Sequence, residues 1–212
     1  MLGADAGLTH ADASITDAAA IETVVAARRP EVVFNCAAYN AVDRAESEPD
    51  AAFAANAEGP ANIALACRRH GAALVHFSTN FVFDGASPEP YLESDEPSPQ
   101  STYARSKLEG ERRVLETGSH VLVVRTAAVF GGPRSFPARI LERARAGEGL
   151  RVVSDQTVNP TYARDLAVAA LDLAERGFAG IVHAVADGCC AWDELARVTL
   201  GEAGVSAEVE SI

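Results

Sequence analysis

The sequence predicts a doubly wound α/β fold, in which helices cover both faces of a parallel β-sheet. Short β-rich runs alternate with longer helical stretches along most of the 212 residues. The β-rich runs are continuously apolar instead of alternating, which is typical of strands buried on both faces of a parallel sheet. The length suits one α/β domain with a sizeable core and is short for two. We therefore predict a single domain over residues 1–212.

The elements follow from the apolar runs and from the glycines that end the helices. Four of the predicted helices stop directly before a glycine, a residue that adopts the left-handed backbone of helix ends without strain. Thr161 is the expected N-cap of one of them, because its hydroxyl can accept a free N–H of the first turn. In chain order we predict strand 31–38, helix 51–70, strand 73–78, helix 102–117, strand 120–125, helix 136–146, helix 161–176, strand 180–184 and helix 192–201.

The charge balance limits the partners. Eighteen basic against thirty acidic residues give a formal net charge of −12. A surface that binds nucleic acid or an anionic membrane needs a concentrated basic patch, so neither is expected as a partner. The chain has no apolar run of about 18 residues and no visible secretory signal, so we expect no membrane span. The four cysteines form no C-x-x-C pair, which favours a reducing, cytoplasmic setting.

Tyr103 and Lys107 are the strongest chemical signal in the sequence. They stand four residues apart at the start of a predicted helix, so both side chains leave the same face. An ammonium group beside a phenol favours the phenolate and makes proton exchange feasible near neutral pH. Among the 18 lysines and arginines, Lys107 is the only lysine. The alternative interpretation is a solvated helix face with an incidental aromatic residue.

Polar and small residues follow two of the predicted strands. Ser78 and Thr79 stand at the end of strand 73–78, and residues 35–40 (NCAAYN) end the strand before it. In open α/β sheets, ligands bind outside the carboxyl ends of the strands. A hydroxyl there can donate to a substrate carbonyl oxygen while Tyr103 protonates it, and small residues let a flat cofactor approach the backbone. The alternatives are hydroxyls that cap local backbone groups and an ordinary buried strand end.

Several chemical motifs are absent from the sequence. The five histidines lack the spacing of metal ligands, which disfavours a zinc site, and we predict no metal ligands. Neither G-x-S-x-G nor G-x-x-x-x-G-K-[ST] occurs, which disfavours a hydrolase or a P-loop enzyme. No G-x-G-x-x-G follows a strand, since Gly3 and Gly7 have the wrong spacing.

Taken together, these motifs resemble the extended short-chain dehydrogenase/reductase superfamily and its Rossmann-like fold. Three segments narrow the resemblance to the dTDP-4-dehydrorhamnose reductase family: residues 35–64, residues 78–85 (STNFVFDG) and residues 155–167 (DQTVNPTYARDLA). The similarity extends from about Ser14 to Ile212. The resemblance implies NADPH or NADH as the cofactor. It also implies an Mg²⁺ ion and a homodimer, for which the family resemblance is the sole basis.

The resemblance assigns roles to individual residues. Thr79 would orient the C4 carbonyl of the sugar, Tyr103 would donate the proton, and Lys107 would hold the nicotinamide ribose and lower the tyrosine pKa. The implied cofactor-binding residues are Ser14, Ile15, Ala38, Tyr39, Asn40, Phe77, Tyr103 and Lys107. The implied substrate-binding residues are Val42, Thr79, Asn80, Phe81 and Ala128, with substrate-binding parts at about 131–149 and 187–212.

The chain departs from the family at the sugar pocket. The family usually has the sequence S-T-D-Y at residues 78–81. This chain keeps Ser78 and Thr79 but has Asn80 in place of the aspartate and Phe81 in place of the tyrosine. It often has tryptophan where this chain has Ala128. These changes remove a carboxylate, a hydroxyl and an indole from the sugar pocket. They affect groups that contact the substrate and not those expected to carry out hydride transfer, so they leave the identity of the sugar open.

The function implied is NAD(P)H-dependent reduction of the 4-keto group of a nucleotide-linked 6-deoxyhexose, dTDP-4-dehydro-L-rhamnose giving dTDP-L-rhamnose. One alternative is 4-keto reduction of another dTDP-deoxysugar. A second alternative is a non-catalytic regulatory subunit resembling the β subunit of methionine adenosyltransferase. The presence of both Tyr103 and Lys107 speaks against the regulatory subunit.

The chain is expected to be a piece of the family's full sequence, truncated at both ends. Residues 11–17 (ADASITD) match the stretch just after the family's second strand, so the first strand and the Gly-rich loop that receives a pyrophosphate would be missing. Removing a central parallel strand exposes the edges of its neighbours. We therefore expect the 212-residue chain to be poorly soluble, to bind NADPH weakly and to reduce little or nothing.

Overall fold

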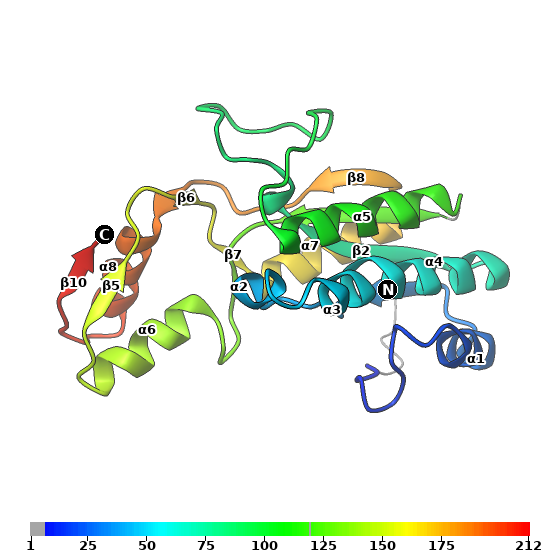
Figure 1. Cartoon of the computed structure of the whole chain (residues 1–212), viewed down its shortest axis with the longest axis horizontal. Coiled ribbons are helices and arrows are strands. Elements are labelled where there is room, and N and C mark those ends of the chain that lie inside the picture. Colours follow the sequence, from blue (N-terminus) through cyan, green and yellow to red (C-terminus); the bar gives the residue numbers. More distant parts are fainter. Residues whose placement is uncertain (1–6, 119) are drawn as a thin grey trace. The chain divides into compact units, whose positions relative to one another are not determined.

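The computed structural model describes residues 7–118 and 120–212, and in this part of the chain the predicted α/β fold is confirmed. Its main sheet has four strands in the order β1-β2-β3-β8 (Figure 1). Strands β1 and β2 are parallel with Val32 opposite Ala73, and β3 and β8 are parallel with Leu122 opposite Gly180. The four strands are β1 (Val32–Asn35), β2 (Ala73–Thr79), β3 (Val121–Thr126) and β8 (Gly180–His183).

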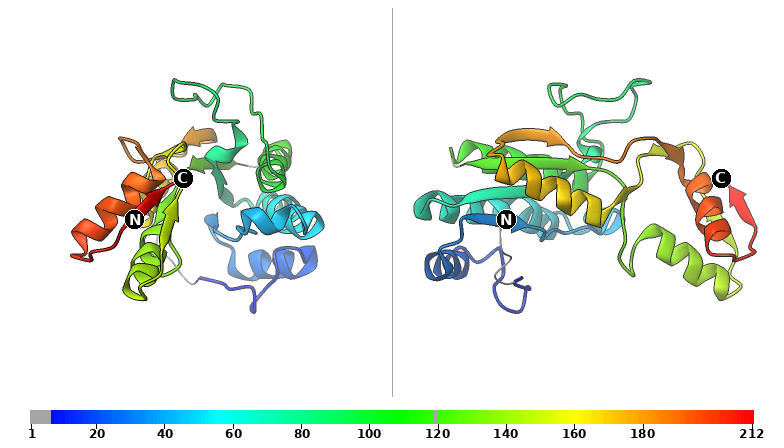
Figure 2. Two further views of the ribbon diagram at one scale, coloured as in Figure 1. Left: turned by 60° about the vertical axis from the view of Figure 1, so that its left-hand side comes forward. Right: turned by 180° about the vertical axis from the view of Figure 1, so that it is seen from behind.

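Helices cover both faces of this sheet. Helices α4 (Gly59–His70) and α5 (Thr102–Glu116) lie on one face, and the part of α7 (Ala163–Glu175) from Ala170 onward lies on the other (Figures 1 and 2). Helix α1 (Ala18–Arg28) packs beside α4. Apolar side chains of α1, α4, α5, β2 and β3 form the main core, which includes Ile21, Val25, Ile63, Leu74, Val114 and Val123.

The chain falls into two compact units, although the sequence predicted one domain. The first unit comprises Met1–Arg125 and Ala170–His183, and the second comprises Thr126–Ala169 and Ala184–Ile212. The second unit contains both segments expected to bind substrate, 131–149 and 187–212, and their role stays a prediction.

The second unit has its own small core. Helices α6 (Phe136–Arg145) and α8 (Trp192–Glu202) pack together, with the ring centroids of Phe136 and Trp192 4.7 Å apart. Three two-stranded sheets accompany them: β5 (Leu150–Val152) with β10 (Val209–Ser211), β4 (Val129–Phe130) with β7 (Thr161–Tyr162), and β6 (Thr157–Val158) with β9 (Cys190–Ala191).

Two predicted element boundaries are wrong, each for a local reason. The strand predicted at 31–38 ends at Asn35, whose side-chain oxygen accepts the N–H of Ala37 at 3.1 Å and turns the chain. Thr161 is not the N-cap of α7, because it lies in β7 and its hydroxyl donates to the carbonyl of Asn159 and accepts the N–H of Ala186. The helix therefore begins at Ala163.

The helical stretch before β2 is more irregular than predicted. The single helix expected at 51–70 consists of α3 (Pro49–Phe53), a π-helical turn (Ala54–Glu58) and α4, preceded by the short α2 (Val42–Ala45). The sequence analysis assigned no element to α1, which Asp17 caps by accepting the N–H groups of Ala19 and Ala20 at 3.0 Å each.

A hollow of about 1480 Å³ lies beside β1 in the first unit. Its walls include apolar side chains of α1, β1 and α7. Within the described residues β1 pairs with β2 alone, and Ala73 donates to the carbonyl of Glu31, so parallel pairing turns the backbone groups of Val32 and Phe34 away from β2. Among the described residues, β1 thus forms an apolar edge strand whose outer backbone groups pair with no other strand. The poor solubility and weak cofactor binding expected for this chain stay predictions.

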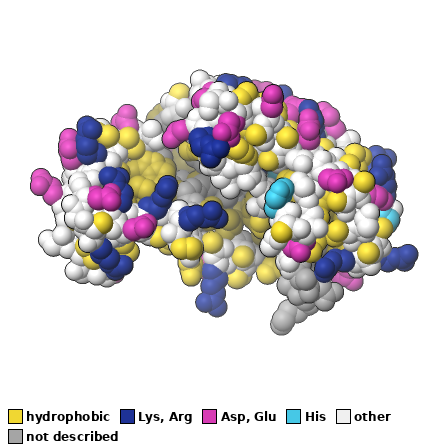
Figure 3. Space-filling view, turned by 60° about the horizontal axis from the view of Figure 1, so that its bottom comes forward, with side chains coloured by type: hydrophobic (Ala, Val, Ile, Leu, Met, Phe, Trp, Pro, Cys, Tyr) yellow, Lys and Arg dark blue, Asp and Glu magenta, His cyan; other side chains and the backbone are white. Residues whose placement is uncertain are grey.

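The surface is mixed in charge. Figure 3 shows acidic and basic side chains interspersed over the face that it displays. Across the residues that the structure describes, no helix is both long and apolar enough to cross a membrane.

Candidate active site

The first turn of α5 is fixed by polar contacts that precede Tyr103. The hydroxyl of Ser101 accepts the N–H of Ala104 at 3.1 Å and caps the helix. The carboxylate of Glu46 accepts the N–H and the hydroxyl of Thr102, each at 2.7 Å. These contacts satisfy donors that a helix start otherwise leaves free, so the turn that carries Tyr103 is held rigidly.

Thr79 ends β2 and meets Tyr103. Its hydroxyl accepts the N–H of Phe81 at 3.2 Å, which caps the 3₁₀ turn Asn80–Val82, and donates to Oδ1 of Asn80 at 3.4 Å. The ring of Phe81, 40% exposed, lies edge-on to the ring of Tyr103 with centroids 6.2 Å apart. The structure thus brings Thr79, Phe81 and Tyr103 together, with the half-buried Asn80 at the start of the same turn.

The pKa of Tyr103 moves in the direction opposite to the sequence-based prediction. Burial raises the pKa of the phenol, and the hydrogen bond with Thr79 opposes that rise. Lys107 is not among the groups that shift this pKa, and the lysine ammonium donates to the backbone carbonyl of Phe77. Tyr103 is therefore protonated at neutral pH, as a proton donor must be.

Lys107 is a buried cation with spare hydrogen-bonding capacity. Its side chain is 3% exposed, and its Nζ donates to the carbonyl of Phe77 at 2.6 Å. Burial lowers the pKa of Lys107 from 10.5 to about 8, and the charge of Glu111 partly opposes this. An ammonium group has three N–H donors, and the contacts of the described residues use one of them. The remaining donors are suited to hydroxyl groups of a ligand.

A neutral histidine accompanies this lysine. Ala37 donates to Oδ1 of Asn35 at 3.1 Å, which directs the Asn35 Nδ2 to donate to Nδ1 of His76, also at 3.1 Å. The imidazole proton must then lie on Nε2, which has no partner among the described residues. Burial and the charge of Lys107 hold the pKa of His76 well below its ordinary range. His76 therefore stays neutral and adds no second positive charge beside Lys107.

The loop between β1 and α2 carries the candidates Ala38, Tyr39 and Asn40. Ala38 and Tyr39 are half-buried, whereas Asn40 is exposed. Tyr39 and Val42 pack against the small cluster that contains Tyr103, and the Tyr39 hydroxyl donates to Glu48 at 2.5 Å. The structure therefore places these cofactor and substrate candidates beside the candidate proton donor.

Other predicted site residues lie elsewhere. Ser14 and Ile15 precede α1, and Ile15 contacts α4: its carbonyl accepts from Asn62 at 3.0 Å, and its side chain lies over Gly59, where even a Cβ would come within 2.5 Å. Ala128 belongs to the second unit and has a left-handed backbone with φ of 42°. A positive φ is uncommon for a residue other than glycine, so this position is strained.

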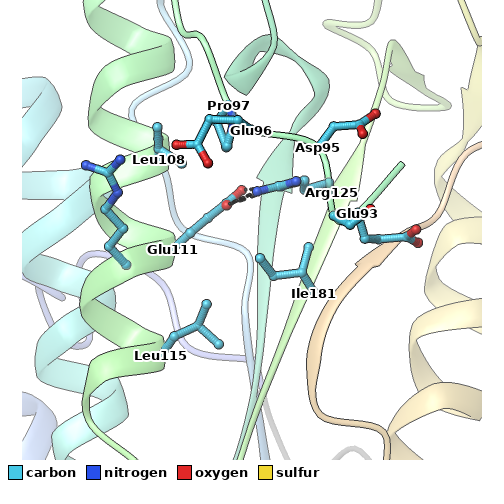
Figure 4. Close-up of a pocket in the computed structure, with 11 residues that line it drawn as sticks. Glu93, Asp95, Glu96, Pro97, Leu108, Glu111, Leu115, Arg125 and Ile181 are labelled. Carbon is cyan, nitrogen blue, oxygen red and sulfur yellow. Dashed lines mark hydrogen bonds and ion pairs between the residues drawn. The ribbon is translucent and has the colours of Figure 1, made fainter. Parts of the chain in front are cut away.

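Sequence reasoning missed a buried ion pair beside these residues. Glu111, one turn after Lys107, accepts from Nε and Nη2 of Arg125 at 3.0 and 2.7 Å. Figure 4 shows this pair in a hollow of about 300 Å³, which is also lined by Glu93 and Asp95. One signal was available, because Arg125 is a lone charge at the end of an apolar strand and Glu111 shares the helix face of Lys107.

The sequence analysis also missed Asn56 and Ser106. Both are fully buried and hydrogen-bonded to each other. The available signal was a lone asparagine in a run of small residues, and a serine placed between Tyr103 and Lys107. In the described parts of the chain, no group of three or more His, Cys, Asp or Glu side chains could hold a metal ion. The Mg²⁺ ion implied by the resemblance stays a prediction.

A parallel sheet covered by a helix that carries a tyrosine and a lysine one turn apart is typical of one class of protein, the Rossmann-like oxidoreductases. Within that class, the chain belongs to the family described as the RmlD substrate binding domain, whose model matches residues 4–212. The resemblance found in the sequence is thereby confirmed.

Individual relatives agree with this assignment. A dTDP-4-dehydrorhamnose reductase of Mycobacterium tuberculosis (strain CDC 1551 / Oshkosh) is 46% identical over 208 residues, which cover 95% of this chain and 68% of the relative. A probable dTDP-4,6-dihydroxy-2-methyloxan-3-one 4-ketoreductase of Streptomyces antibioticus is 40% identical over 197 residues, covering 91% and 66%. The chain thus spans about two thirds of the length of these relatives.

A solved structure shares the fold closely. The crystal structure of dTDP-4-dehydrorhamnose reductase from Bacillus anthracis str. Ames, in complex with NADP, aligns with a TM-score of 0.94 at 34% identity. The alignment covers 97% of this chain and 73% of that one.

Proposed function

We propose that the protein reduces the 4-keto group of a dTDP-linked 6-deoxyhexose with NADPH, converting dTDP-4-dehydro-L-rhamnose to dTDP-L-rhamnose. The observation that carries the proposal is that the buried Tyr103, one turn before Lys107 on α5, faces the end of β2, where the Phe81 ring lies edge-on to it two residues after Thr79. The M. tuberculosis relative, 46% identical, bears the name of this reductase.

The residues present fit a nicotinamide cofactor. The Lys107 ammonium keeps donors for ribose hydroxyls, and the half-buried Ala38 offers a small side chain beside Tyr39 and the exposed Asn40. NADPH, when bound, supplies the hydride that adds to C4 of the sugar. Lys107, Phe77 and the loop of Ala38, Tyr39 and Asn40 bind the nicotinamide half, while Ser14 and Ile15 bind the adenosine half.

Tyr103 supplies the proton. Its hydroxyl donates to the substrate oxygen as negative charge develops there, and the Thr79 hydroxyl donates to the same oxygen. Val42, Asn80 and Phe81 contact the sugar nucleotide.

The test is turnover of dTDP-4-dehydro-L-rhamnose with NADPH by the protein, followed through the absorbance of the reduced nicotinamide. A Tyr103→Phe variant should lose about 10²–10⁴-fold in kcat, the usual contribution of a positioned acid. Tyr91→Phe is the matched control, because its hydroxyl donates to Asp84 and not to the site. Full activity of Tyr103→Phe would exclude Tyr103 as the donor.

A second candidate is 4-keto reduction of a different dTDP-deoxysugar. The observation that favours it is the sugar-pocket sequence, with Asn80, Phe81 and Ala128, together with the similarity to the S. antibioticus 4-ketoreductase. Comparison of kcat/KM for several dTDP-4-keto sugars separates the two candidates, since the true substrate must give the highest value.

A further inference from the structure

Two adjacent cysteines, Cys189 and Cys190, stand at the start of β9 in the second unit. Cys189 is exposed and Cys190 is half-buried, whereas Cys67 of α4 is fully buried. Burial raises the pKa of the Cys190 thiol, and the charges of Glu194 and Cys189 raise it further. The two thiols are therefore close enough to influence each other, and the first of them is within reach of small molecules in solution.

The backbone on either side of the two cysteines is held by hydrogen bonds. On the N-terminal side, the carbonyl of Gly188 accepts from Nδ2 of Asn159 at 2.7 Å. On the C-terminal side, in the first turn of α8, the N–H of Asp193 donates to the carbonyl of Val153 at 3.2 Å. A change of conformation at the two thiols is therefore confined to a few residues between these two anchors.

The paired backbone of β9 opposes a bond between the two sulfur atoms. In the antiparallel pair of β6 and β9, Cys190 lies opposite Val158 and Ala191 opposite Thr157. Consecutive side chains of an extended chain point to opposite faces. Neighbouring Cα atoms are also only about 3.8 Å apart, below the roughly 4.4–6.8 Å of ordinary disulfides. A disulfide between adjacent cysteines therefore requires the backbone at Cys190 to leave its extended geometry, and such a strained bond is easily reduced.

We propose that Cys189 and Cys190 form a redox-sensitive site, which hydrogen peroxide oxidises to a cyclic disulfide that releases β9 from β6. In the first step the exposed Cys189 sulfur attacks one peroxide oxygen, the O–O bond breaks, and a sulfenic acid forms as one water molecule leaves. In the second step the Cys190 sulfur attacks the Cys189 sulfur, so that an S–S bond forms and the S–O bond breaks. The departing hydroxyl takes the Cys190 thiol proton and leaves as a second water molecule. The two thiols together lose two electrons, which the peroxide accepts.

The position of the site links its oxidation to substrate binding. The cysteines lie in the segment 187–212, which is expected to bind substrate, and β9 leads directly into α8, where the Trp192 ring packs on Phe136 of α6. Release of β9 frees the backbone just before Trp192. The effect on activity rests on the proposed function. Oxidation should raise the KM of the sugar nucleotide several-fold and leave the Kd of NADPH unchanged, because the cofactor-binding candidates lie in the first unit.

Mass spectrometry tests the chemistry without cofactor or sugar. The experiment uses the Cys36→Ser variant, which removes the other exposed cysteine. Hydrogen peroxide should remove two hydrogen atoms from the tryptic peptide 177–197, which contains both adjacent cysteines and no other, and dithiothreitol should restore them. Adding Cys190→Ser should stop the reaction at the sulfenic acid of Cys189, which dimedone labels, and adding Cys189→Ser should abolish the internal disulfide. Oxidation of Cys189 to a sulfinic acid with Cys190 still reduced would overturn the proposal.

Hydrogen exchange measures the release of β9. Peroxide should speed amide exchange at residues 157–158 and 190–191 of Cys36→Ser, but not when Cys189→Ser is added. The pair of β5 and β10 in the same unit is the internal control and should exchange at the same rate before and after oxidation. A disulfide that forms without faster exchange at these four residues would overturn the proposed release of β9. Absence of turnover by the reduced protein with every dTDP-4-keto sugar contradicts the proposed function instead, because neither mass nor exchange depends on turnover.

Discussion

Lys107 and Arg125 are two buried cations beside the same helix, and the structure treats them in opposite ways. Each is 3% exposed. Arg125 donates to both carboxylate oxygens of Glu111 and lies 5.1 Å from the ring centroid of Phe83. Lys107 donates to one backbone carbonyl, and in the part of the chain that the structure describes no carboxylate forms an ion pair with it.

This difference separates a charge that the protein itself neutralises from one that it leaves available to a ligand. A buried charge costs several kcal/mol unless groups around it compensate. The protein compensates Arg125 fully with Glu111, whereas it leaves Lys107 with donors and positive charge that a ligand can satisfy. The same contrast appears in the pKa of Lys107, which burial lowers to about 8.

The largest expected effect comes from breaking the compensated pair. Glu111→Gln leaves Arg125 as an unpaired buried charge, so the free energy of unfolding should fall by about 3–5 kcal/mol. Urea denaturation measures it. Glu109→Gln is the control, because its pair with Arg113 is partly exposed and should be worth no more than about 1 kcal/mol. If the two substitutions lower the free energy of unfolding equally, burial of the Glu111–Arg125 pair does not increase the cost of breaking it.

Removal of the Lys107 ammonium should lower activity but raise stability, the opposite of the effect on stability expected for Glu111→Gln. Lys107→Met should lower kcat about a hundredfold to a thousandfold, because the cofactor ribose loses its ammonium partner. The same substitution should raise the free energy of unfolding at neutral pH, since it replaces a buried charge with an apolar chain. Kinetics and urea denaturation of one preparation measure both. A variant that is both active and destabilised would reverse the comparison.

The pH dependence of stability sharpens the contrast further. Below pH 8, Lys107 is protonated in the folded and unfolded states, so the folded state carries the full cost of its burial. Between pH 8 and 10.5 the unfolded state binds the extra proton, so the free energy of unfolding should rise with pH, by about 3 kcal/mol in all. The measurement is the difference between wild type and Lys107→Met across this range. A flat difference would mean that the folded-state pKa of Lys107 is not lowered.

The smallest effect tests geometry separately from charge. Arg125→Lys keeps the positive charge but loses the planar fork that meets both oxygens of Glu111. The free energy of unfolding should fall by about 1.5–3 kcal/mol, the usual worth of a charged hydrogen bond, and thus by less than in Glu111→Gln. Thermal or urea denaturation of the two variants side by side decides the order. If Arg125→Lys costs more, the fork matters more than the charge.

Much of the fold could be predicted because the signals are local. Continuous apolar runs located β2, β3 and β8, and small residues and closing glycines located α5 and α6. The failures are also instructive. Thr161 has the residue type of an N-cap, yet its hydroxyl is used by Asn159 and Ala186, the second of which is distant in sequence. Residue type alone does not reveal which of two available partners a hydroxyl takes.

The sequence by itself determined the alternation of strands and helices and the pairing of Tyr103 with Lys107 on one helix face, because both depend on spacings of a few residues. Only the tertiary structure decided how those groups are charged and held. Burial, which depends on the whole fold, raises the pKa of Tyr103 and lowers that of Lys107. The contacts of Asn56 with Tyr39 and Ser106 span 17 and 50 residues, and no local pattern records a hydrogen bond made across such a distance.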